Sequence, residues 1–499
     1  RRGRAGLLRS LGYHGSLHRA NEGRRKPNPQ QRTRAIRKSV QDFWSGVLER
    51  AYALREVDVH GDRAAPSGSL EGRTRSFLQT LAGSGRGVPG AFRTCVRAEG
   101  SRNCVPQTVE ETRECLLESR RWLSDGKEEL EGATQLVRDV VRAIEASEPD
   151  TAAGAPFNVC AGKKETWLAD RRGLVVLTIE RLLKLLELGP KPTLTPQELL
   201  EGEFCDPIYV FIKDEPHKLE KLAKERYRII SCVSILDTLV ERVLYTLQNK
   251  TEIDHCDYIP YKPGMGLHDS GKEALYSWFK KRQAEYQLAS TDVSAWDWSV
   301  TDWMLEDDGH YRIQVAGGEG SGWADLVLAQ HYAVSHKVFV LPSGEMFAQT
   351  EGGVLPSGCF NTSSTNSHMR HGLASHVQLE LDCFEEWSRA EGAQMGDDAQ
   401  ERYVDGMLDE YVKLGFTVKG VEVCAPGRFS FCSTLWDGDW KGEPESWKKT
   451  LFRFLSHPRG SYSPALLDSL KYDFRHLKNG EELIARASAF VDKYVVGDC

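Results

Sequence analysis

Several features that would define a protein class are missing from this sequence of 499 residues. Its twelve cysteines include no CxxC pair, and none lies at zinc-ligand spacing with a histidine pair, which favours reduced thiols over a zinc module or a disulfide scaffold. No run of 18 or more uncharged apolar residues occurs, so the sequence predicts no transmembrane helix. The remaining class is a large globular chain, 40% hydrophobic and 27% charged, that exceeds the usual size of a single domain.

Acidic residues are nearly absent from the first 38 positions. This segment holds twelve Lys and Arg against one acid, Glu22, so it carries a charge of +11 and the rest of the chain −18. A basic arm on an acidic body is typical of a protein with a polyanionic partner, although a solvated, disordered tail would have the same composition. We therefore predict a basic, flexible arm at 1–38, and both interpretations stay open.

Hydrophobic periodicity predicts a largely helical first half. Helices are expected within 108–146, with a break at Asp125-Gly126, and at 174–188 and 236–248, with a strand at 209–212. Beyond residue 285 the pattern reads strand, helix, strand, hairpin, helix, strand, and the last sixty or so residues are mostly helical. This order predicts an α+β domain with helices packed on one face of an antiparallel sheet.

Three short segments of the α+β stretch carry residue types suited to metal-dependent chemistry. Segment 290–297 is a strand that delivers one aspartate at its end and a second five positions later. Segment 357–366 is a glycine-containing loop that enters a helix, and 395–398 is a Met-Gly-Asp-Asp turn between two short strands. Each segment is weak evidence alone, because a Gly-Asp-Asp triplet should arise by chance in roughly one such chain in five.

The order and spacing of these segments are more informative than their composition. Asp292 and Ser357 are 65 residues apart, and Ser357 and Asp397 are 40 apart. Each segment also lies in a plausible strand, loop or helix context. A chance match to all three in this order is improbable.

In this order the segments resemble motifs A, B and C in the palm of viral RNA-dependent RNA polymerases. Four more segments extend the resemblance: 151–157 is similar to motif G, 213–230 to motif F, 414–419 to motif D and 429–433 to motif E. The resemblance covers about residues 150–455, with all seven motifs in the family order. The amino-acid sequences of motif F and of 262–266 are most similar to those of the sobemovirus, polerovirus and barnavirus lineage.

The resemblance implies an α+β fold shaped as a right hand, with a palm sheet of the ferredoxin or RRM type. A basic arm is expected at 1–38, followed by an N-terminal extension at 39–110 that joins the fingers. The fingers, with motifs G and F, are expected at 111–285. The palm, with motifs A to E, is expected at 286–435 with a fingers insertion near 303–345, and a small helical thumb at 436–499.

The activity implied is that of an RNA-dependent RNA polymerase copying a viral positive-strand RNA genome from NTPs. Such an enzyme uses two Mg²⁺ ions, with Mn²⁺ as a possible substitute, and Mg²⁺ prefers hard carboxylate oxygens. Asp292 and Asp397, on adjacent strands, are expected to bridge both ions, with Asp398 assisting. Lys419 of motif D is the expected general acid for pyrophosphate, although Lys413 is close enough to leave this assignment open.

The resemblance also assigns residues to the nucleotide and to RNA. Lys213 and Arg228 of motif F are expected to bind the incoming triphosphate. Gly358 is expected to give the motif B loop its flexibility, and Asn366 alone would also fit a helix-start cap. The expected readers of the ribose 2′-hydroxyl are Asp297, Ser357, Thr362 and Asn366. The expected template and primer contacts are Gly154, Pro156, Phe431, Cys432 and Ser433.

The expected partners are an RNA template, nascent RNA and NTPs, with a genome-linked protein primer left open. The expected location is a membrane-associated replication complex in the host cytoplasm. A reverse transcriptase would share the palm chemistry, but Met395 and Asp297 stand where such enzymes usually have an aromatic residue and a bulky gate. An RNA-packaging protein would explain the basic arm and leave the seven motifs unexplained.

Overall fold

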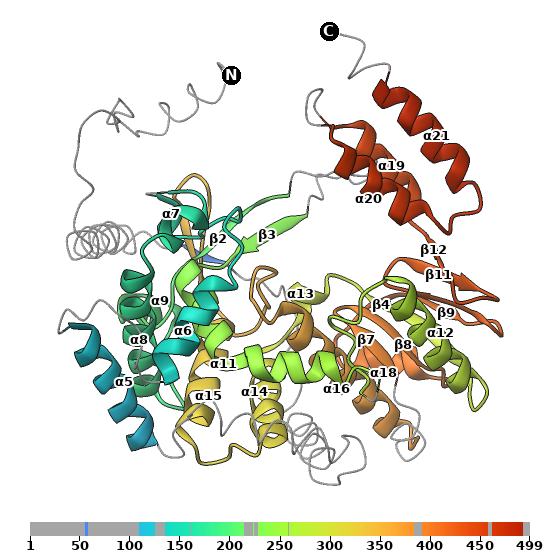
Figure 1. Ribbon diagram of the computed structural model, residues 1–499. Helices are drawn as coiled ribbons and strands as arrows, with labels where there is room; N and C mark the ends of the chain where they lie inside the picture. Colours follow the sequence, from blue (N-terminus) through green and yellow to red (C-terminus); the bar gives the residue numbers. More distant parts are fainter. Residues whose placement is uncertain are drawn as a thin grey trace.

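The computed structural model describes residues 55–57, 109–124, 135–159, 161–213, 223, 228–257, 259–383, 392–457 and 462–492. The predicted basic arm at 1–38 lies outside these residues, as does nearly all of the predicted extension at 39–110. The described chain runs from a helical bundle with a mixed sheet, through an antiparallel sheet, to a separate group of C-terminal helices (Figure 1).

A bundle of long helices forms the first hydrophobic core. The predicted helices within 108–146, 174–188 and 236–248 are confirmed. The last begins at Ile235, where the Ser234 hydroxyl caps it by accepting the N–H of Asp237 at 3.0 Å, and it continues beyond the predicted end to Asp254. The bundle contains α5 (Val109–Ser124), α6 (Gln135–Glu145), α8 (Arg171–Leu188), α11 (Ile235–Asp254) and α15 (Gly322–Ser335). Short helical segments beside it are η1 (Phe157–Val159), α7 (Lys164–Leu168) and α9 (Pro196–Glu201).

A five-stranded mixed sheet lies next to the bundle. In spatial order its strands are β1 (Arg55–Val57), β6 (Met346–Gln349), β5 (Val338–Val340), β2 (Ile208–Ile212) and β3 (Ile229–Cys232). Strand β2 confirms the strand predicted at 209–212. Strand β5 pairs in parallel with β2 although it follows α14 (Asp302–Ala316) and α15, so the segment near 303–345 packs with much earlier parts of the chain.

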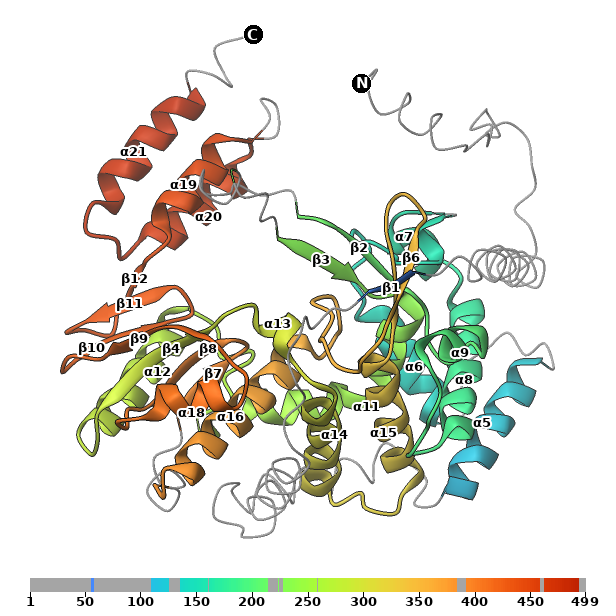
Figure 2. The ribbon, with the colours of Figure 1, turned by 180° about the vertical axis from the view of Figure 1, so that it is seen from behind.

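The second sheet is entirely antiparallel and follows the predicted order of elements. Its strands lie in the order β7 (Ala393–Met395), β8 (Asp398–Arg402), β4 (Leu288–Val293) and β9 (Val418–Val423). Helices α16 (Thr362–Glu380) and α18 (Met407–Lys413) cover one face and share a core with β4 (Figure 2). The predicted antiparallel sheet with helices packed on it is present, but its other face is covered too, because Phe279 of α12 (Asp269–Gln283) shares a core with Leu288 of β4. The short helix α13 (Trp296–Ser299) follows β4.

A third core lies where α12 (Asp269–Gln283) meets a small sheet of β10 (Arg428–Phe431), β11 (Thr434–Asp437) and β12 (Glu443–Pro444). The C-terminal helices α19 (Trp447–Leu455), α20 (Pro464–Phe474) and α21 (Gly480–Val491) have their own apolar core. Arg475 and His476 join these helices to α12, because each contacts the carboxylate of Asp269, at 2.7 and 2.8 Å.

Two expectations from composition can be compared with this fold. The cysteines whose side chains the structure describes are free thiols, namely Cys205, Cys232, Cys256, Cys359, Cys383, Cys424 and Cys432. Among the described helices, none is both long and apolar enough to cross a bilayer.

A buried group of charges ties α11, α14, α15 and α16 together. The Asp308 carboxylate contacts Arg312 at 2.9 Å, His331 at 3.0 Å and His368 at 2.6 Å, and the other nitrogen of His368 lies 3.0 Å from Glu252. Burial alone would lower the pKa of His368, but the two carboxylates beside it raise the pKa above its usual value. We infer that His368 is a buried cation.

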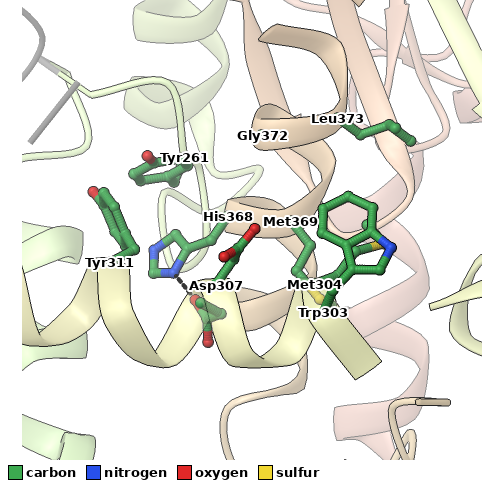
Figure 3. Close-up of a pocket in the computed structure, with 10 residues that line it drawn as sticks. Tyr261, Trp303, Met304, Asp307, Tyr311, His368, Met369, Gly372 and Leu373 are labelled. Carbon is green, nitrogen blue, oxygen red and sulfur yellow. Dashed lines mark hydrogen bonds and ion pairs between the residues drawn. The ribbon is translucent and has the colours of Figure 1, made fainter. Parts of the chain in front are cut away.

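A small cavity lies beside this group, between α14 and α16 (Figure 3). Its volume of about 20 Å³ for water centres is room for roughly one water molecule. Tyr261 and Tyr311 flank His368 on one side of the cavity, and Trp303 and Met304 lie on the other (Figure 3). The cavity is too small for a nucleotide.

The protonated state of His368 predicts a pH-dependent stability. Because its folded pKa is raised, its stabilisation is fully present below about pH 6.5 and is lost as the pH rises through the folded pKa. His368→Gln should lower the free energy of unfolding by about 3 kcal/mol at pH 6, since it removes one partner of a buried ion pair. Thermal unfolding from pH 6 to 9 measures both effects.

His310→Gln is the matched control, because His310 lies on α14 and is 37% exposed in its side chain. Its pH profile should run parallel to that of the native chain. The assignment is wrong if His368→Gln also keeps the native profile.

Candidate functional site

The antiparallel sheet brings the three predicted metal ligands to one end of neighbouring strands. Asp292, near the end of β4, pairs directly with Asp398, the first residue of β8. Asp397 precedes it in the β7–β8 turn, where Gly396 takes a positive φ of 67°. The N–H of Gly396 donates to the Ser367 hydroxyl at 3.0 Å. Asp397 was expected on a strand adjacent to that of Asp292; it lies instead in the turn, and the register places Asp398 opposite Asp292.

The carboxylates lie close enough to affect one another. Burial, followed by the charges of Asp397, Asp292 and Glu445, raises the pKa of Asp398 to about 6. The N–H of Cys432 opposes this shift by donating to the Asp398 carboxylate. Asp292 and Asp397 are exposed, whereas Asp398 is partly buried. The end of the sheet therefore concentrates negative charge.

The predicted general acid lies beside the same carboxylates. Strand β9 pairs with β4 on the side away from β8, and it places the Lys419 Nζ 3.3 Å from both oxygens of Asp292. Lys413, the alternative, lies on α18 and contacts Glu410 at 2.5 Å. The geometry thus favours Lys419 over Lys413 as the lysine of the site.

The donor set fits a hard divalent cation, since it consists of carboxylate oxygens whose mutual repulsion a cation would relieve. In the part of the chain that the structure describes, however, no three Asp, Glu, His or Cys side chains converge as a complete metal site. Lys419 holds both oxygens of Asp292 in this arrangement. The lysine must leave Asp292 before that carboxylate can bind a cation with both oxygens.

A second polar pair lies next to the carboxylates. The Asn366 amide donates to Asp297 at 2.9 Å, and the Trp296 indole N–H donates to the Asn366 oxygen at 2.8 Å. Because α16 begins at Thr362, Asn366 is inside the helix, and the alternative of a helix-start cap is wrong. Burial is the largest influence on the pKa of Asp297 and raises it. The hydrogen bond from Asn366 lowers the pKa, the negative charge of Asp397 raises it, and the positive charge of Arg228 lowers it. Two of the four predicted ribose readers are thus joined to each other.

The other two predicted ribose readers hold the loop before α16. The Ser357 hydroxyl accepts the N–H of Ser231 on β3 at 3.2 Å, and the Thr362 hydroxyl donates to two carbonyls of its own loop at 2.8 and 3.0 Å. A Cβ at Gly358 would lie 2.3 Å from the Ser231 carbonyl oxygen. Close packing against β3 therefore requires glycine here, and the predicted flexibility of the loop stays a prediction.

Two buried charges that the sequence did not indicate hold the ends of this loop. Glu241 on α11 accepts the N–H of Phe360 at 2.5 Å, from a position 119 residues away. Lys337 donates to the carbonyls of Gly353 and Val354 at 2.6 and 2.7 Å, and burial lowers its pKa to about 7. Their roles depend on tertiary contacts, so no local pattern could have revealed Glu241.

The two predicted triphosphate-binding residues face each other across a hairpin. The Lys213 N–H donates to the Arg228 carbonyl at 2.8 Å and extends the β2–β3 pairing by one step. The charge of Arg228 acts on Asp297, which links this hairpin to the carboxylate end of the sheet. The other lysines and arginine of motif F lie outside the described residues, namely Lys218, Lys221, Lys224 and Arg226.

The predicted template and primer contacts differ in accessibility. Gly154 and Pro156 are buried, and a Cβ at Gly154 would lie 2.4 Å from the Val233 carbonyl oxygen. Phe431 is also buried, at 3% exposure. Cys432 and Ser433 form a left-handed turn between β10 and β11 that reaches Asp398. Only this turn combines accessible atoms with closeness to the carboxylates.

Several viral proteins are similar to this chain. Residues 92–435 match the family described as viral RNA-directed RNA-polymerase. The chain is 41% identical over 308 residues to the RNA-directed RNA polymerase of Mushroom bacilliform virus, covering 60% of this chain and 73% of that protein. It is 37% identical over 313 residues to the replicase polyprotein P2AB of Southern bean mosaic virus, covering 61% of this chain and 31% of that protein.

Two further similarities extend over more of this chain. Protein P1-P2 of Potato leafroll virus is 32% identical over 412 residues, which cover 78% of this chain and 37% of that protein. Among solved structures, the sicinivirus 3Dpol RNA-dependent RNA polymerase aligns with a TM-score of 0.53 at 14% identity. The alignment covers 72% of this chain and 80% of that one, which is a likeness of fold.

The raised pKa of Asp398 predicts that this carboxylate destabilises the fold when no divalent cation is bound. A raised folded pKa means that stability falls as the pH rises from the usual carboxyl range through about 6. Asp398→Asn should therefore raise the free energy of unfolding by about 1–2 kcal/mol at pH 7.5 and change little at pH 4. Urea unfolding with EDTA at both pH values measures this.

Asp437→Asn, at an exposed position on β11, is the control and should change stability at neither pH. A less stable Asp398→Asn protein at pH 7.5 would contradict the proposed repulsion.

Proposed function

This chain belongs to the family of viral RNA-directed RNA polymerases, which are enzymes, and we propose that it copies a viral positive-strand RNA genome by joining ribonucleotides from NTPs. The observation that carries this proposal is the pairing of Asp292 with Asp398 beside Asp397 and Lys419. The predicted similarity to the sobemovirus, polerovirus and barnavirus lineage is confirmed by the relatives described above.

Asp292, Asp397 and Asp398 would hold two Mg²⁺ ions, with Mn²⁺ as a possible substitute. When bound, such ions stabilise the charge on the attacking and leaving oxygens of an in-line displacement. The support lies in an all-oxygen donor set at the end of two paired strands, where burial and then the neighbouring negative charges raise the pKa of Asp398. This end of the sheet is therefore where the reaction would take place.

In the reaction, the 3′-hydroxyl of the nascent RNA would lose its proton to water as its oxygen forms a bond to the α-phosphorus of an NTP, and the bond from that phosphorus to pyrophosphate would break. Lys419 would give a proton from its Nζ to the leaving pyrophosphate. Its position 3.3 Å from Asp292 supports this role, because a general acid must lie near the reacting atoms. Lys213 and Arg228 would bind the triphosphate, since phosphate is recognised well by charge-assisted hydrogen bonds.

The joined pair Asp297 and Asn366 would read the ribose. A carboxylate and an amide can accept from and donate to a 2′-hydroxyl, and a site that pairs with this group disfavours a sugar lacking it. The charge of Arg228 acts on Asp297, which supports the approach of the triphosphate and the ribose to the same point. Ser357, Gly358 and Thr362 would act through the loop that they hold.

The right-hand division provides the framework for this proposal. The fingers would comprise 111–285 with an insertion near 303–345, the palm 286–435 and the thumb 436–499. Packing of α14 and α15 in the helical bundle, and of β5 and β6 in the mixed sheet, supports the insertion. The separate core of α19, α20 and α21 supports the thumb.

The expected partners follow from this activity. Template and nascent RNA would pass the Cys432–Ser433 turn, and the basic arm at 1–38, outside the described residues, would add non-specific and salt-sensitive RNA binding. A genome-linked protein remains a proposed primer. A replication complex at a host cytoplasmic membrane remains the proposed location.

The direct test of the activity is template-dependent incorporation of labelled NTPs with Mg²⁺ or Mn²⁺, with and without a primer. Asp397→Asn should reduce synthesis at least about 1,000-fold while leaving RNA affinity within twofold, because it removes a metal ligand and not an RNA contact. Asp437→Asn is the matched control. Retained synthesis by Asp397→Asn would refute the metal assignment, and an inactive native chain would count against the proposed activity.

Ribose selection can be tested in the same assay. Asp297→Ala should narrow the preference for ribonucleotides over deoxyribonucleotides about 10-fold or more, because the Asn366 amide loses its partner and the 2′-hydroxyl its acceptor. Competition between GTP and dGTP at equal concentration measures the ratio. Unchanged selectivity would contradict the role of Asp297.

A further inference from the structure

A fully buried polar network lies directly behind the metal-binding end of the sheet. Arg370 of α16 donates to Glu401 of β8 at 2.8 Å, to the Thr291 hydroxyl of β4 at 2.5 Å and to the Tyr411 hydroxyl of α18 at 2.8 Å. Tyr411 donates to the second oxygen of Glu401 at 2.7 Å, and Thr291 donates to the first. None of these four side chains is more than 3% exposed.

The network joins four elements that surround the carboxylates. Thr291 directly precedes Asp292, and Glu401 lies three residues after Asp398 on the strand that pairs with β4. One guanidinium therefore spans the two strands whose register brings Asp292 and Asp398 opposite each other. No residue of the network reaches the end of the sheet itself, so none would touch the metal, the NTP or RNA.

The same helix reaches the other parts of the site. Asn366, one turn before Arg370 on α16, contacts Asp297, and Ser367 accepts the N–H of Gly396 in the Asp397 turn. Three neighbouring side chains of α16 thus reach three parts of the site. Asn366 contacts Asp297, Ser367 contacts the turn that carries Asp397, and Arg370 contacts strands β4 and β8. A change at Arg370 would be transmitted to all three.

We propose that Arg370, Glu401, Tyr411 and Thr291 are positioning residues that set the placement of Asp292 against Asp398, and so the affinity of the site for divalent cations. The inference rests on the proposed function. Buried ion pairs often contribute little net stability, because desolvation offsets their attraction. A network of this kind is better suited to fixing one geometry, and misplacing reacting groups by about 1 Å can cost roughly 100-fold in rate.

The decisive variant is Tyr411→Phe, which removes one hydroxyl and preserves the ring. It should weaken Mn²⁺ binding by the RNA-free enzyme about 5-fold or more, measured by electron paramagnetic resonance. In the synthesis assay it should lower kcat about 10-fold and raise the Mg²⁺ concentration for half-maximal rate, with the KM for NTP within twofold. A merely structural residue would move neither the Mn²⁺ affinity nor the Mg²⁺ requirement.

Tyr245→Phe is the matched control. Tyr245 is equally buried, at 1% exposure, and its hydroxyl contacts Gln330 and His331 in the helical bundle, away from the carboxylates. It should lose stability to a similar extent and keep native Mn²⁺ affinity. If both tyrosine variants bind Mn²⁺ like the native chain, or if both lose it equally, the inference is wrong.

A second pair of variants decides the matter if Tyr411→Phe does not fold. Thr291→Ser keeps the hydroxyl and should keep near-native Mn²⁺ affinity and kcat, whereas Thr291→Val removes it and should reproduce the losses expected for Tyr411→Phe. Equal behaviour of these two variants would overturn the inference. Because Mn²⁺ binding is measured without RNA or NTP, native Mn²⁺ binding without any synthesis would count against the proposed function and leave this test intact.

Discussion

The antiparallel register of β4 against β8 is the constraint on which the rest of the site depends. It places Asp292 opposite Asp398, and a shift of one residue would turn either side chain to the other face of the sheet. Like charges at paired positions oppose this arrangement, as the raised pKa of Asp398 indicates. The apolar core shared by β4, α16 and α18 counteracts this repulsion, because burying its side chains stabilises the same register.

Helix α16 explains how a polar site can be built inside a folded core. Almost all of its residues from Ser364 to Gln378 are buried, although many are Ser, Thr, Asn, His or Arg. Buried polar groups of this kind are stabilised only when they are hydrogen-bonded, and their partners come from α11, α14, β4, β8 and α18. The helix therefore fixes the relative positions of elements that are far apart in the chain.

The order of helices and strands could be predicted from the sequence because periodicity is a local property. The motif segments also predicted residues that the structure brings together, namely the carboxylates, Lys419 and the Asp297–Asn366 pair. What the sequence could not provide were contacts between distant positions. Ser357 and Ser231 are 126 residues apart, and only their contact shows why Gly358 must be glycine. Asp397 was expected on a strand for the same reason, since a turn residue and a strand residue look alike until the register is known.

The contact between Lys419 and Asp292 makes the lysine a competitor of the cation. Lys419 occupies both oxygens of Asp292, and a cation held by this carboxylate would need them too, so in the proposed reaction the two binding equilibria would be linked, and linkage is reciprocal. A triphosphate that draws Lys419 away would raise the affinity of Asp292 for the ion, and a bound ion would free the lysine for the leaving group. Substrate and metal would then bind cooperatively, through one side chain that exchanges partners.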